Sequence, residues 1–332
     1  MVNYKQLASQ NAEVDATGQR AVVSGGTQGI GAGIALRFAL AGASVWLVGR
    51  SEDKAQEVLK KLQDASAEAA RRSQVNGGSS ASSSPGSNAE HEFFKADLSN
   101  TQAIRKLADD ISSKAGSRGI DYLIETQGGP PHGRIETTDE GIETQFSVQV
   151  LSRVGLARLL AEKGTIKKGI FMVAAPGGGG SSAIDPDDLD FVKLKQQGKW
   201  WGGPIGLMKK GAMQSSVLDS AAQTLAEQNP NLTVVHAFPG FILTDALANQ
   251  GHSNLIVLAG KVFGPLLANK PGPGGYAELP FHVLANPTGQ RYLETGTANL
   301  LGPFLGKKSL SPNVQDKGVR EKIWNKLGSY FS

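Results

Sequence analysis

Short runs of strand length alternate along the chain with longer segments in which apolar residues recur every three or four positions. The short runs cover residues 21–23, 45–48, 92–94, 122–124, 170–173 and 232–237. Helical spacing dominates the segments between them, as over 104–113 and 212–226. Such alternation is typical of a parallel sheet with crossover helices. We therefore predict one α/β domain, a Rossmann-like, doubly wound parallel sheet of six strands flanked by helices.

A glycine-rich turn lies between the first predicted strand and the helix that follows it. Glycines there let the backbone approach a pyrophosphate, and the helix N-terminus adds amide donors and a positive dipole. Because this turn has a strand before it and a helix after it, we read it as a dinucleotide site. The residues predicted to contact the cofactor are Ser24, Gly25, Thr27, Gln28, Gly29, Ile30 and Gly31.

The end of the second predicted strand indicates which dinucleotide is bound. An acidic residue at this position would bind the ribose hydroxyls of NAD, but the chain has Arg50 followed by Ser51. A guanidinium can bind a 2′-phosphate with two hydrogen bonds, and Ser51 can assist. We therefore predict NADP(H), with an ordinary surface role for Arg50 as the alternative.

Two segments interrupt the alternation. A Ser/Gly-rich tract over 73–88 is predicted to be a flexible surface insertion, because its composition offers little apolar surface to bury. Residues 176–203 combine glycines, an acidic cluster and two adjacent tryptophans, and we expect this loop to meet the substrate. The predicted organisation is an N-terminal extension over 1–18, the dinucleotide-binding domain over 19–300 and a C-terminal helical extension over 301–332.

Composition narrows the function further. The chain has 332 residues, of which 39% are hydrophobic and 19% charged, with no cysteine and a net charge of +4. Without cysteine there is no thiolate metal site, and no metal is predicted. The cations are interleaved with acids, so we do not expect nucleic acid as a partner. No apolar stretch approaches the roughly 20 residues of a membrane span, and the polar first residues lack a signal's apolar core. We expect a cytoplasmic protein.

Three motifs occur in the order found in one known family: the Ser24–Gly31 turn, Asp97-Leu98 after the third strand, and Pro239-Gly240 with Thr244 after the sixth. Over residues 18–298 the chain thereby resembles the short-chain dehydrogenase/reductase family. The resemblance implies that Asp97 and Leu98 frame the adenine, and that Pro239, Gly240, Ile242 and Thr244 hold the nicotinamide. It also puts Gln127 and Gly128, in the loop after the fourth strand, at the cofactor.

The same resemblance shows that the family's usual catalytic side chains are largely missing. Lys210 matches the family's lysine, which also binds the ribose, but the tyrosine four residues earlier is replaced by Gly206. The serine expected after the fifth strand is replaced by Ala175, and the asparagine that anchors a water by Gln149. The catalytic candidates that remain are Lys210, Gln149, Asp185, Asp187 and His132. Each has a plain alternative: solvated loop charges for the aspartates, a turn residue for His132, and ribose binding alone for Lys210.

These replacements shape the functional hypothesis. Hydride addition to a neutral ketone builds an alkoxide, which is costly without a donor. An iminium is neutralised by hydride, and a polarised alkene can take its proton from solvent. We therefore predict an atypical NADP(H)-dependent reductase of a small organic molecule of natural-product type. Trp200, Trp201 and Pro176 are the predicted substrate contacts, although the tryptophans could instead pin the loop.

Two other functional classes stay open at this stage. One is a non-redox enzyme, a cyclase, pericyclase or isomerase, that uses the same pocket. The other is a non-catalytic NADP(H)-binding scaffold, which would have a closed cleft over the nicotinamide. We expect a homodimer, because the predicted helices over 137–163 and 212–228 lie where many relatives of the family form dimers.

Overall fold

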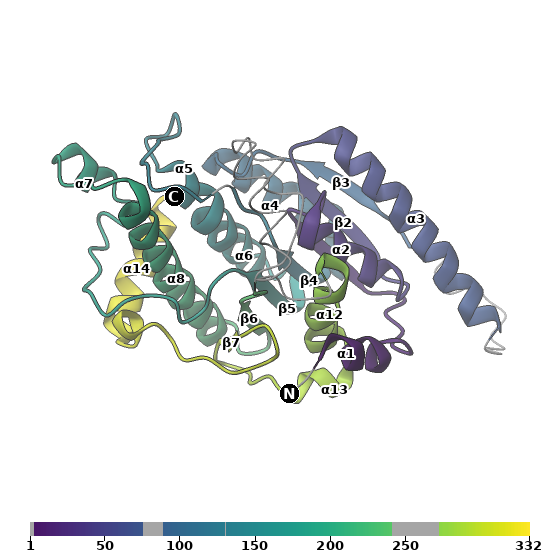
Figure 1. The fold of residues 1–332 in the computed structure, drawn as a ribbon. Coiled ribbons are helices and arrows are strands. Elements are labelled where there is room, and N and C mark those ends of the chain that lie inside the picture. The colour runs from purple at the N-terminus through teal and green to yellow at the C-terminus, as the bar shows by residue number, and fades with distance from the viewer. Residues whose placement is uncertain (1–2, 76–88, 130, 241–271) are drawn as a thin grey trace.

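A seven-stranded parallel sheet forms the centre of the computed structural model, which describes residues 3–75, 89–129, 131–240 and 272–332. The strand order is β3-β2-β1-β4-β5-β6-β7, so the chain winds outwards in both directions from the β1–β4 pair (Figure 1). The strands are β1 (Arg20–Ser24), β2 (Ser44–Gly49), β3 (Glu92–Lys95), β4 (Ile120–Glu125), β5 (Ile166–Val173), β6 (Thr233–Ala237) and β7 (Asn299–Leu301). The predicted doubly wound α/β fold is confirmed.

The prediction of six strands was one too few. The seventh strand, β7, is three residues long and pairs in parallel with β6, from Val235 opposite Asn299 to Ala237 opposite Leu301. A run this short has no readable period, and its extended backbone depends on the β6 edge beside it.

Helices cover both faces of the sheet, and two separate apolar cores lie beneath them. One layer contains α1 (Tyr4–Asn11), α2 (Gly29–Ala39), α3 (Glu52–Val75), α11 (Gly272–Tyr276), α12 (Glu278–Ala285) and α13 (Pro287–Gln290). The other contains α4 (Thr101–Ala115), η1 (Gly116–Arg118), α5 (Thr144–Phe146), η2 (Ser147–Leu151), α6 (Ser152–Glu162), α8 (Gly203–Gln228), η3 (Pro312–Val314) and α14 (Lys317–Ser329). A short helix, α7 (Val192–Gln196), interrupts the predicted substrate loop.

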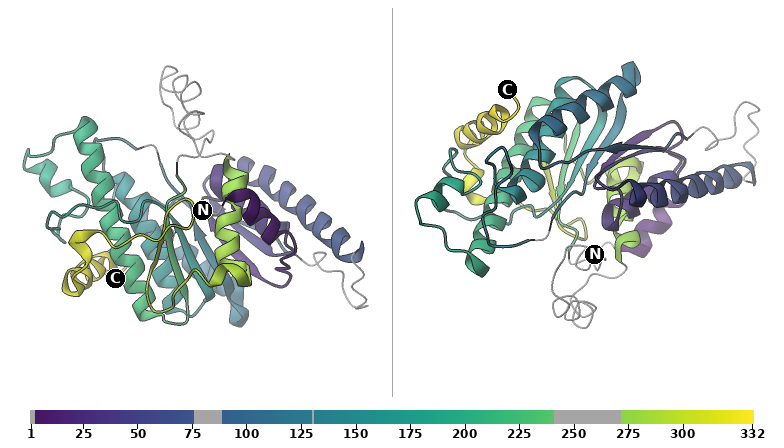
Figure 2. Two further views of the ribbon diagram at one scale, coloured as in Figure 1. Left: turned by 60° about the horizontal axis from the view of Figure 1, so that its bottom comes forward. Right: turned by 90° about the horizontal axis from the view of Figure 1, so that it is seen from above.

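The C-terminal part of the chain is built into the domain. Figure 2 shows α14 beside α8, on the side of the sheet away from α1 and α12. Ile323, Trp324 and Leu327 of α14 are buried in the same core as α8. The helical spacing that predicted this helix thus reflects packing against the sheet's own helices.

The helix expected over 137–163 begins later than the spacing suggests. Residues 137–143 form a loop closed by an antiparallel bridge between Thr137 and Glu143, and helical structure starts at Thr144. Its second section, η2, is a π-helix. Such turns are often found at functional sites.

Some predictions fall on residues that the structure does not describe. Helix α3 continues to Val75, and the rest of the predicted insertion, 76–88, lies outside the described residues. The same holds for Ile242 and Thr244. Within the described ranges, no helix is both long and apolar enough to cross a membrane.

Candidate functional site

A cavity of about 510 Å³ opens where the strands β1 to β4 end. In a doubly wound sheet this carboxyl edge, beside the point where strand order reverses, is where ligands bind. Eleven of the predicted cofactor residues line it: Gly25, Thr27, Gln28, Gly29, Ile30, Gly31, Arg50, Asp97, Leu98, Gln127 and Gly128. The other lining residues are Gly49, Ala96, Thr126, Gly129, His132, Glu136, Thr144, Gln145 and Val148.

The glycine-rich turn packs too closely against the end of β4 to carry side chains. A Cβ at Gly25, where φ is +74°, would lie 2.7 Å from the Gln127 nitrogen. A Cβ at Gly31 would lie 2.3 Å from the Gly25 carbonyl oxygen. The turn is held by Thr126, which donates to the Ser24 carbonyl from its amide at 2.9 Å and its hydroxyl at 2.8 Å. This cradle of backbone fits a dinucleotide pyrophosphate at the start of α2.

Two charged side chains that follow β2 and β3 also line this cavity. Arg50, the residue after β2, is exposed. Asp97 also lines it, and its Oδ1 accepts hydrogen bonds from the amide and hydroxyl of Ser99. Ser51 is not among the lining residues, and its hydroxyl accepts a 3.4 Å hydrogen bond from the Lys54 amide at the start of α3. Arg50 is therefore the cation available to a phosphate here.

A buried arginine holds the floor of the cavity together. Arg153 of α6 is 2% exposed. Its Nη1 donates to the Gln149 carbonyl at 2.6 Å and to Gln149 Oε1 at 3.0 Å. Its Nη2 donates to the Gln127 carbonyl and, at 3.0 Å, to the Val173 carbonyl. One guanidinium thus joins the π-helix to the ends of β4 and β5, and the charge-assisted bonds compensate for its burial.

Glu125, the last residue of β4, is a second buried charged group on this floor. It is fully buried, and neither carboxylate oxygen has a hydrogen-bond partner among the described residues. Burial raises the pKa of this carboxyl well above its usual value, an effect that the nearby Arg153 guanidinium opposes. Desolvation also lowers the pKa of Arg153 to about 10.

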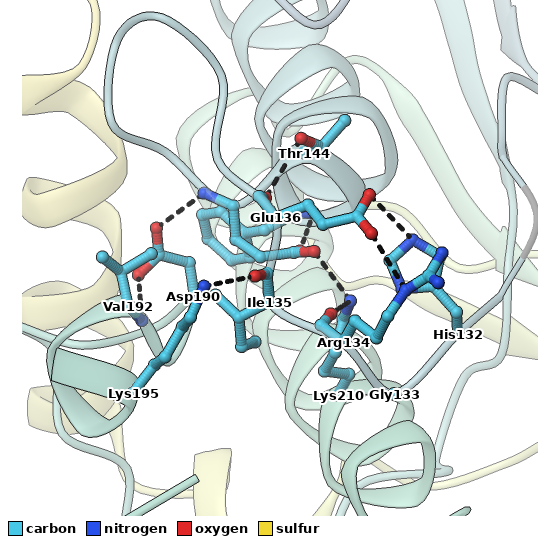
Figure 3. Close-up of polar contacts among 12 residues, drawn as sticks. His132, Gly133, Arg134, Ile135, Glu136, Thr144, Asp190, Val192, Lys195 and Lys210 are labelled. Carbon is cyan, nitrogen blue, oxygen red and sulfur yellow. Dashed lines mark hydrogen bonds and ion pairs between the residues drawn. The ribbon is translucent and has the colours of Figure 1, made fainter. Parts of the chain in front are cut away.

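Beside the cavity runs the segment of residues 132–136, which is attached to the start of α8 and to α7 (Figure 3). Three successive carbonyls of this segment accept hydrogen bonds from three side chains. Trp200 Nε1 donates to Gly133 at 2.9 Å, Lys210 Nζ to Arg134 at 2.9 Å and Lys195 Nζ to Ile135 at 2.8 Å. The 132–136 segment is thereby fixed to the loop and helix that follow β5.

A buried ion pair lies behind this segment. Lys210 Nζ and Glu143 Oε1 are 2.7 Å apart, and the two side chains are 3% and 1% exposed. Glu143 also caps α5, since its side chain accepts a hydrogen bond from the Phe146 amide at 2.7 Å. The pair connects α8 to the beginning of the helix that lines the cavity.

Gly206 of α8 faces the same segment at very short range. A Cβ at Gly206 would lie 2.6 Å from the Gly133 oxygen, 2.8 Å from the Trp201 oxygen and 2.9 Å from Trp200 Cζ2. Backbone of the 132–136 segment therefore fills the space into which a side chain at position 206 would extend.

The 132–136 segment brings two titratable side chains to the cavity wall. His132 and Glu136 both line the cavity, with His132 Nε2 3.9 Å from Glu136 Oε2. Glu136 also pairs with Arg134, whose Nε lies 2.9 Å from Oε1 (Figure 3). The Nδ1 atom of His132 is buried and has no hydrogen-bond partner in the described part of the chain.

Comparison with known proteins connects this architecture to one family. Residues 19–82 match the family model described as short chain dehydrogenase. The NmrA-like family domain-containing oxidoreductase notO of an Aspergillus species is 30% identical over 162 residues, which are 48% of this chain and 46% of that protein. The short chain dehydrogenase/reductase dpfgH of Gibberella zeae is 25% identical over 240 residues, 70% of this chain and 61% of that protein. The chain therefore aligns with less than two thirds of either relative.

A solved structure shows that the likeness extends to the fold. L-sorbose reductase from Gluconobacter frateurii, solved with NADPH and L-sorbose, superposes with a TM-score of 0.57 at 19% identity, over 89% of this chain and 99% of that chain. Residues 19–82 are thus similar to the short-chain dehydrogenases, and the described chain shares the fold of this solved reductase. The glycine-rich turn and Asp97-Leu98 lie at the cavity, Pro239 and Gly240 follow β6, and Thr244 lies outside the described residues.

The structure places Lys210 outside the cavity lining. Its ammonium is engaged by Glu143 and by the Arg134 carbonyl. Gln149 likewise lies outside the lining, and its Oε1 accepts from Arg153. Ala175 is exposed, and its carbonyl accepts a hydrogen bond from the Ser215 hydroxyl. The roles predicted for Lys210 and Gln149 stay predictions.

The residues predicted to contact substrate do not line the cavity either. Asp185 and Asp187 are exposed and form a turn in which Asp185 Oδ1 accepts from the Asp187 amide at 2.9 Å. Trp201 is 71% exposed, whereas Pro176 is buried. Trp200 is half-buried and stacks on Phe191 at 5.0 Å between ring centroids.

Three predicted cofactor residues also lie outside the lining. Ser24 is buried at the end of β1, and its hydroxyl has no hydrogen-bond partner among the described residues. Pro239 and Gly240 follow β6 and are half-buried.

A buried aspartate of α8, Asp219, binds the backbone of the glycine segment that follows β5. Asp219 Oδ2 accepts hydrogen bonds from the Gly177 amide at 3.0 Å, the Ser311 amide at 2.9 Å and the Ser311 hydroxyl at 2.6 Å. Its Oδ1 is 2.9 Å from His236 Nδ1 on β6. The start of the predicted substrate loop is thus anchored to α8, β6 and the C-terminal part of the chain.

Sequence reasoning missed four residues that organise this site: Glu136, Glu143, Arg153 and Trp200 in its role as a backbone donor. Arg153 left a readable signal, because a cation within the apolar stretch of a predicted helix must find partners when buried. Glu143 left none, because its partner Lys210 is distant in the chain. Glu136 left none, because its neighbours His132 and Arg134 lie in an irregular segment with no readable period.

Replacing Glu125 with glutamine tests its burial. Folding raises the pKa of Glu125, so as pH rises the unfolded chain loses the Glu125 proton before the folded chain does. The contribution of Glu125 to the free energy of unfolding therefore falls above pH 4.5. The variant Glu125→Gln lacks this loss. We expect it to be more stable than wild type at pH 7, with the difference growing by at most about 1.4 kcal/mol per pH unit and vanishing near pH 4.5. Urea unfolding at a series of pH values measures this, with exposed Glu57→Gln as the control. A variant less stable than wild type at pH 7 would contradict the assignment.

Two glycines of α8 provide a matched test of the filled space at position 206. Gly206→Ala should cost about 1–3 kcal/mol, because the new methyl group overlaps the Gly133 oxygen. Gly211→Ala, on the same helix with nothing within 4 Å of its Cβ position, should raise stability by up to about 1 kcal/mol. Thermal and urea denaturation give both values. Equal effects of the two changes would show that the 132–136 segment does not fill this space in solution.

Proposed function

We propose that the chain is an NADP(H)-dependent oxidoreductase that works as a reductase of a small organic molecule. The observation that carries this is the cavity itself, in which the glycine cradle, Arg50 and the Asp97-Leu98 pair line one continuous space. Gly25, Thr27, Gln28, Gly29, Ile30 and Gly31 would hold the pyrophosphate, and Asp97 and Leu98 the adenosine. NADPH bound there would supply a hydride.

The preference for NADP(H) rests on charge. Arg50, the residue after β2, is exposed and lines the cavity, and no acidic side chain occupies positions 48–51. A guanidinium can bind a 2′-phosphate with two charge-assisted hydrogen bonds. The related L-sorbose reductase was solved with NADPH, which agrees with this choice.

The proposed substrate follows from the missing tyrosine and serine. Gly206 and Ala175 offer no side-chain donor to an alkoxide, and neither lines the cavity. A substrate with a strongly polarised double bond, an iminium or a conjugated alkene of natural-product type, accepts hydride without that donor. We propose such a substrate for this chain.

Cofactor titration tests the proposal. Arg50→Ala should weaken NADPH binding about 10- to 100-fold, because a hydrogen-bonded charge pair is lost, and change NADH binding less than about threefold. Gly29→Trp should abolish binding of both, since Gly29 lines the cavity and has a φ of +55°. Calorimetry or cofactor fluorescence measures the Kd values.

Lys60→Ala, which removes an exposed cation of α3 outside the cavity, is the control and should change neither affinity. Equal weakening of NADPH and NADH by Arg50→Ala would overturn the NADP(H) assignment. Absence of binding to wild type would overturn the dinucleotide site. Binding without a change in NADPH absorbance during substrate turnover would favour a non-redox enzyme.

A further inference from the structure

Reduction of a conjugated carbonyl compound places negative charge on its oxygen, and a donor at that oxygen lowers the barrier. The structure therefore raises the question of which side chain can supply the proton. Four titratable residues line the cavity in the described part of the chain: Arg50, Asp97, His132 and Glu136. Asp97 is engaged by Ser99, and an arginine does not release its proton in proteins.

Three threonines also line the cavity in the described part of the chain, Thr27, Thr126 and Thr144, but an aliphatic hydroxyl does not release its proton near neutral pH. Two of these hydroxyls are engaged as well: Thr126 donates to the Ser24 carbonyl at 2.8 Å and Thr144 to the Glu136 carbonyl at 3.0 Å. The side chain suited to exchanging a proton near neutral pH is then His132, with Glu136 beside it.

We propose that His132 is the proton donor of this enzyme and that it replaces the missing tyrosine from a different part of the chain. This inference rests on the proposed reductase function and narrows its substrate to a conjugated carbonyl compound. An iminium fits less well, because its positive charge would meet a protonated imidazole.

Close packing at position 206 accounts for the location of His132 at the cavity wall. With glycine at 206, the Gly133 oxygen sits 2.6 Å from the position of a Cβ. The 132–136 segment can therefore lie directly against α8, and the residue next to Gly133 is His132, which lines the cavity. The glycine at position 206 and the placement of His132 at the cavity thus depend on one packing contact.

Three hydrogen bonds hold the segment that carries His132. Trp200, Lys210 and Lys195 donate to the carbonyls of residues 133, 134 and 135 at 2.9, 2.9 and 2.8 Å. Lys210 is thus a positioning residue, which acts on the backbone beside His132 and not on the cofactor. Glu136, 3.9 Å from His132 Nε2 and paired with Arg134, lies on the same stretch of cavity wall.

The reaction balances as follows. The β-carbon of the conjugated carbonyl receives hydride, two electrons and one proton, from the reduced nicotinamide. The electron pair of the carbon–carbon double bond shifts towards the oxygen, which takes a proton from the His132 imidazolium. The resulting enol tautomerises to the saturated carbonyl, NADP⁺ is released, and neutral His132 regains a proton from water.

The test follows NADPH oxidation at 340 nm with three conjugated carbonyl probes, 2-cyclohexen-1-one, trans-cinnamaldehyde and 1,4-naphthoquinone. Wild type should reduce at least one of them. His132→Gln should lower kcat about 10²- to 10³-fold and leave the Kd for NADPH unchanged. Calorimetric titration with NADPH accompanies each assay.

The possible outcomes distinguish failure of the proton-donor assignment from failure of the proposed reductase function. Wild type that fails to bind NADPH overturns the proposed function. Wild type that binds NADPH but reduces none of the probes, or a His132→Gln variant that keeps its rate, overturns the proton-donor assignment. Loss of NADPH binding in His132→Gln also overturns it, since the residue would then be a cofactor contact.

A second pair of variants tests the positioning role. Lys210→Met should lower kcat at least about tenfold without weakening NADPH, whereas neighbouring Lys209→Met, an exposed lysine, should match wild type. Trp200→Phe removes the donor to Gly133 while keeping an aromatic ring beside Phe191, and it should give a smaller loss in the same direction, which keeps the test valid if Lys210→Met unfolds. If Lys210→Met keeps its kcat but binds NADPH at least tenfold more weakly, Lys210 is a ribose ligand and not a positioning residue.

Discussion

The buried guanidinium of Arg153 is the interaction on which the carboxyl edge of the sheet depends. It donates hydrogen bonds to carbonyls at the ends of two strands and in the π-helix. Parallel strands leave their last carbonyls pointing at the ligand side with no neighbouring strand to satisfy them. A charged donor with several N–H groups meets that need at one point and fixes the floor on which a dinucleotide would lie.

The second layer of the site is built by the same means. Carbonyls of residues 133–135 are taken up by an indole and two ammonium groups from the region after β5. The site therefore depends on side-chain donors to irregular backbone rather than on regular secondary structure. Such an arrangement can position a loop accurately. The cations that hold the loop are then engaged by its carbonyls and are not free to bind a ligand, and Lys210 is the clearest case.

Local pattern was enough to predict the sheet and the cofactor turn. Six strands, the Gly29–Ala39 helix and the Ser24–Gly31 turn each depend on residues that are neighbours in the chain. Strand β7 could not be predicted, because three residues become a strand only beside β6. The helix start at Thr144 depends on the cap from Glu143, and that carboxylate is itself held by Lys210, 67 residues further on. A motif match could identify Lys210 but not its partner Glu143. The partner determines whether the ammonium group faces a ligand or is held in an ion pair.

Gly206 has a consequence for any redesign of this part of the molecule. A large side chain introduced at position 206 would meet the Gly133 backbone and the Trp200 ring within its first ångströms. The 132–136 segment would have to move first, and its movement would break three hydrogen bonds and uncover the Lys210–Glu143 pair. Position 206 and the 132–136 segment are therefore coupled, and a change at one requires a compensating change at the other although the two are far apart in the sequence.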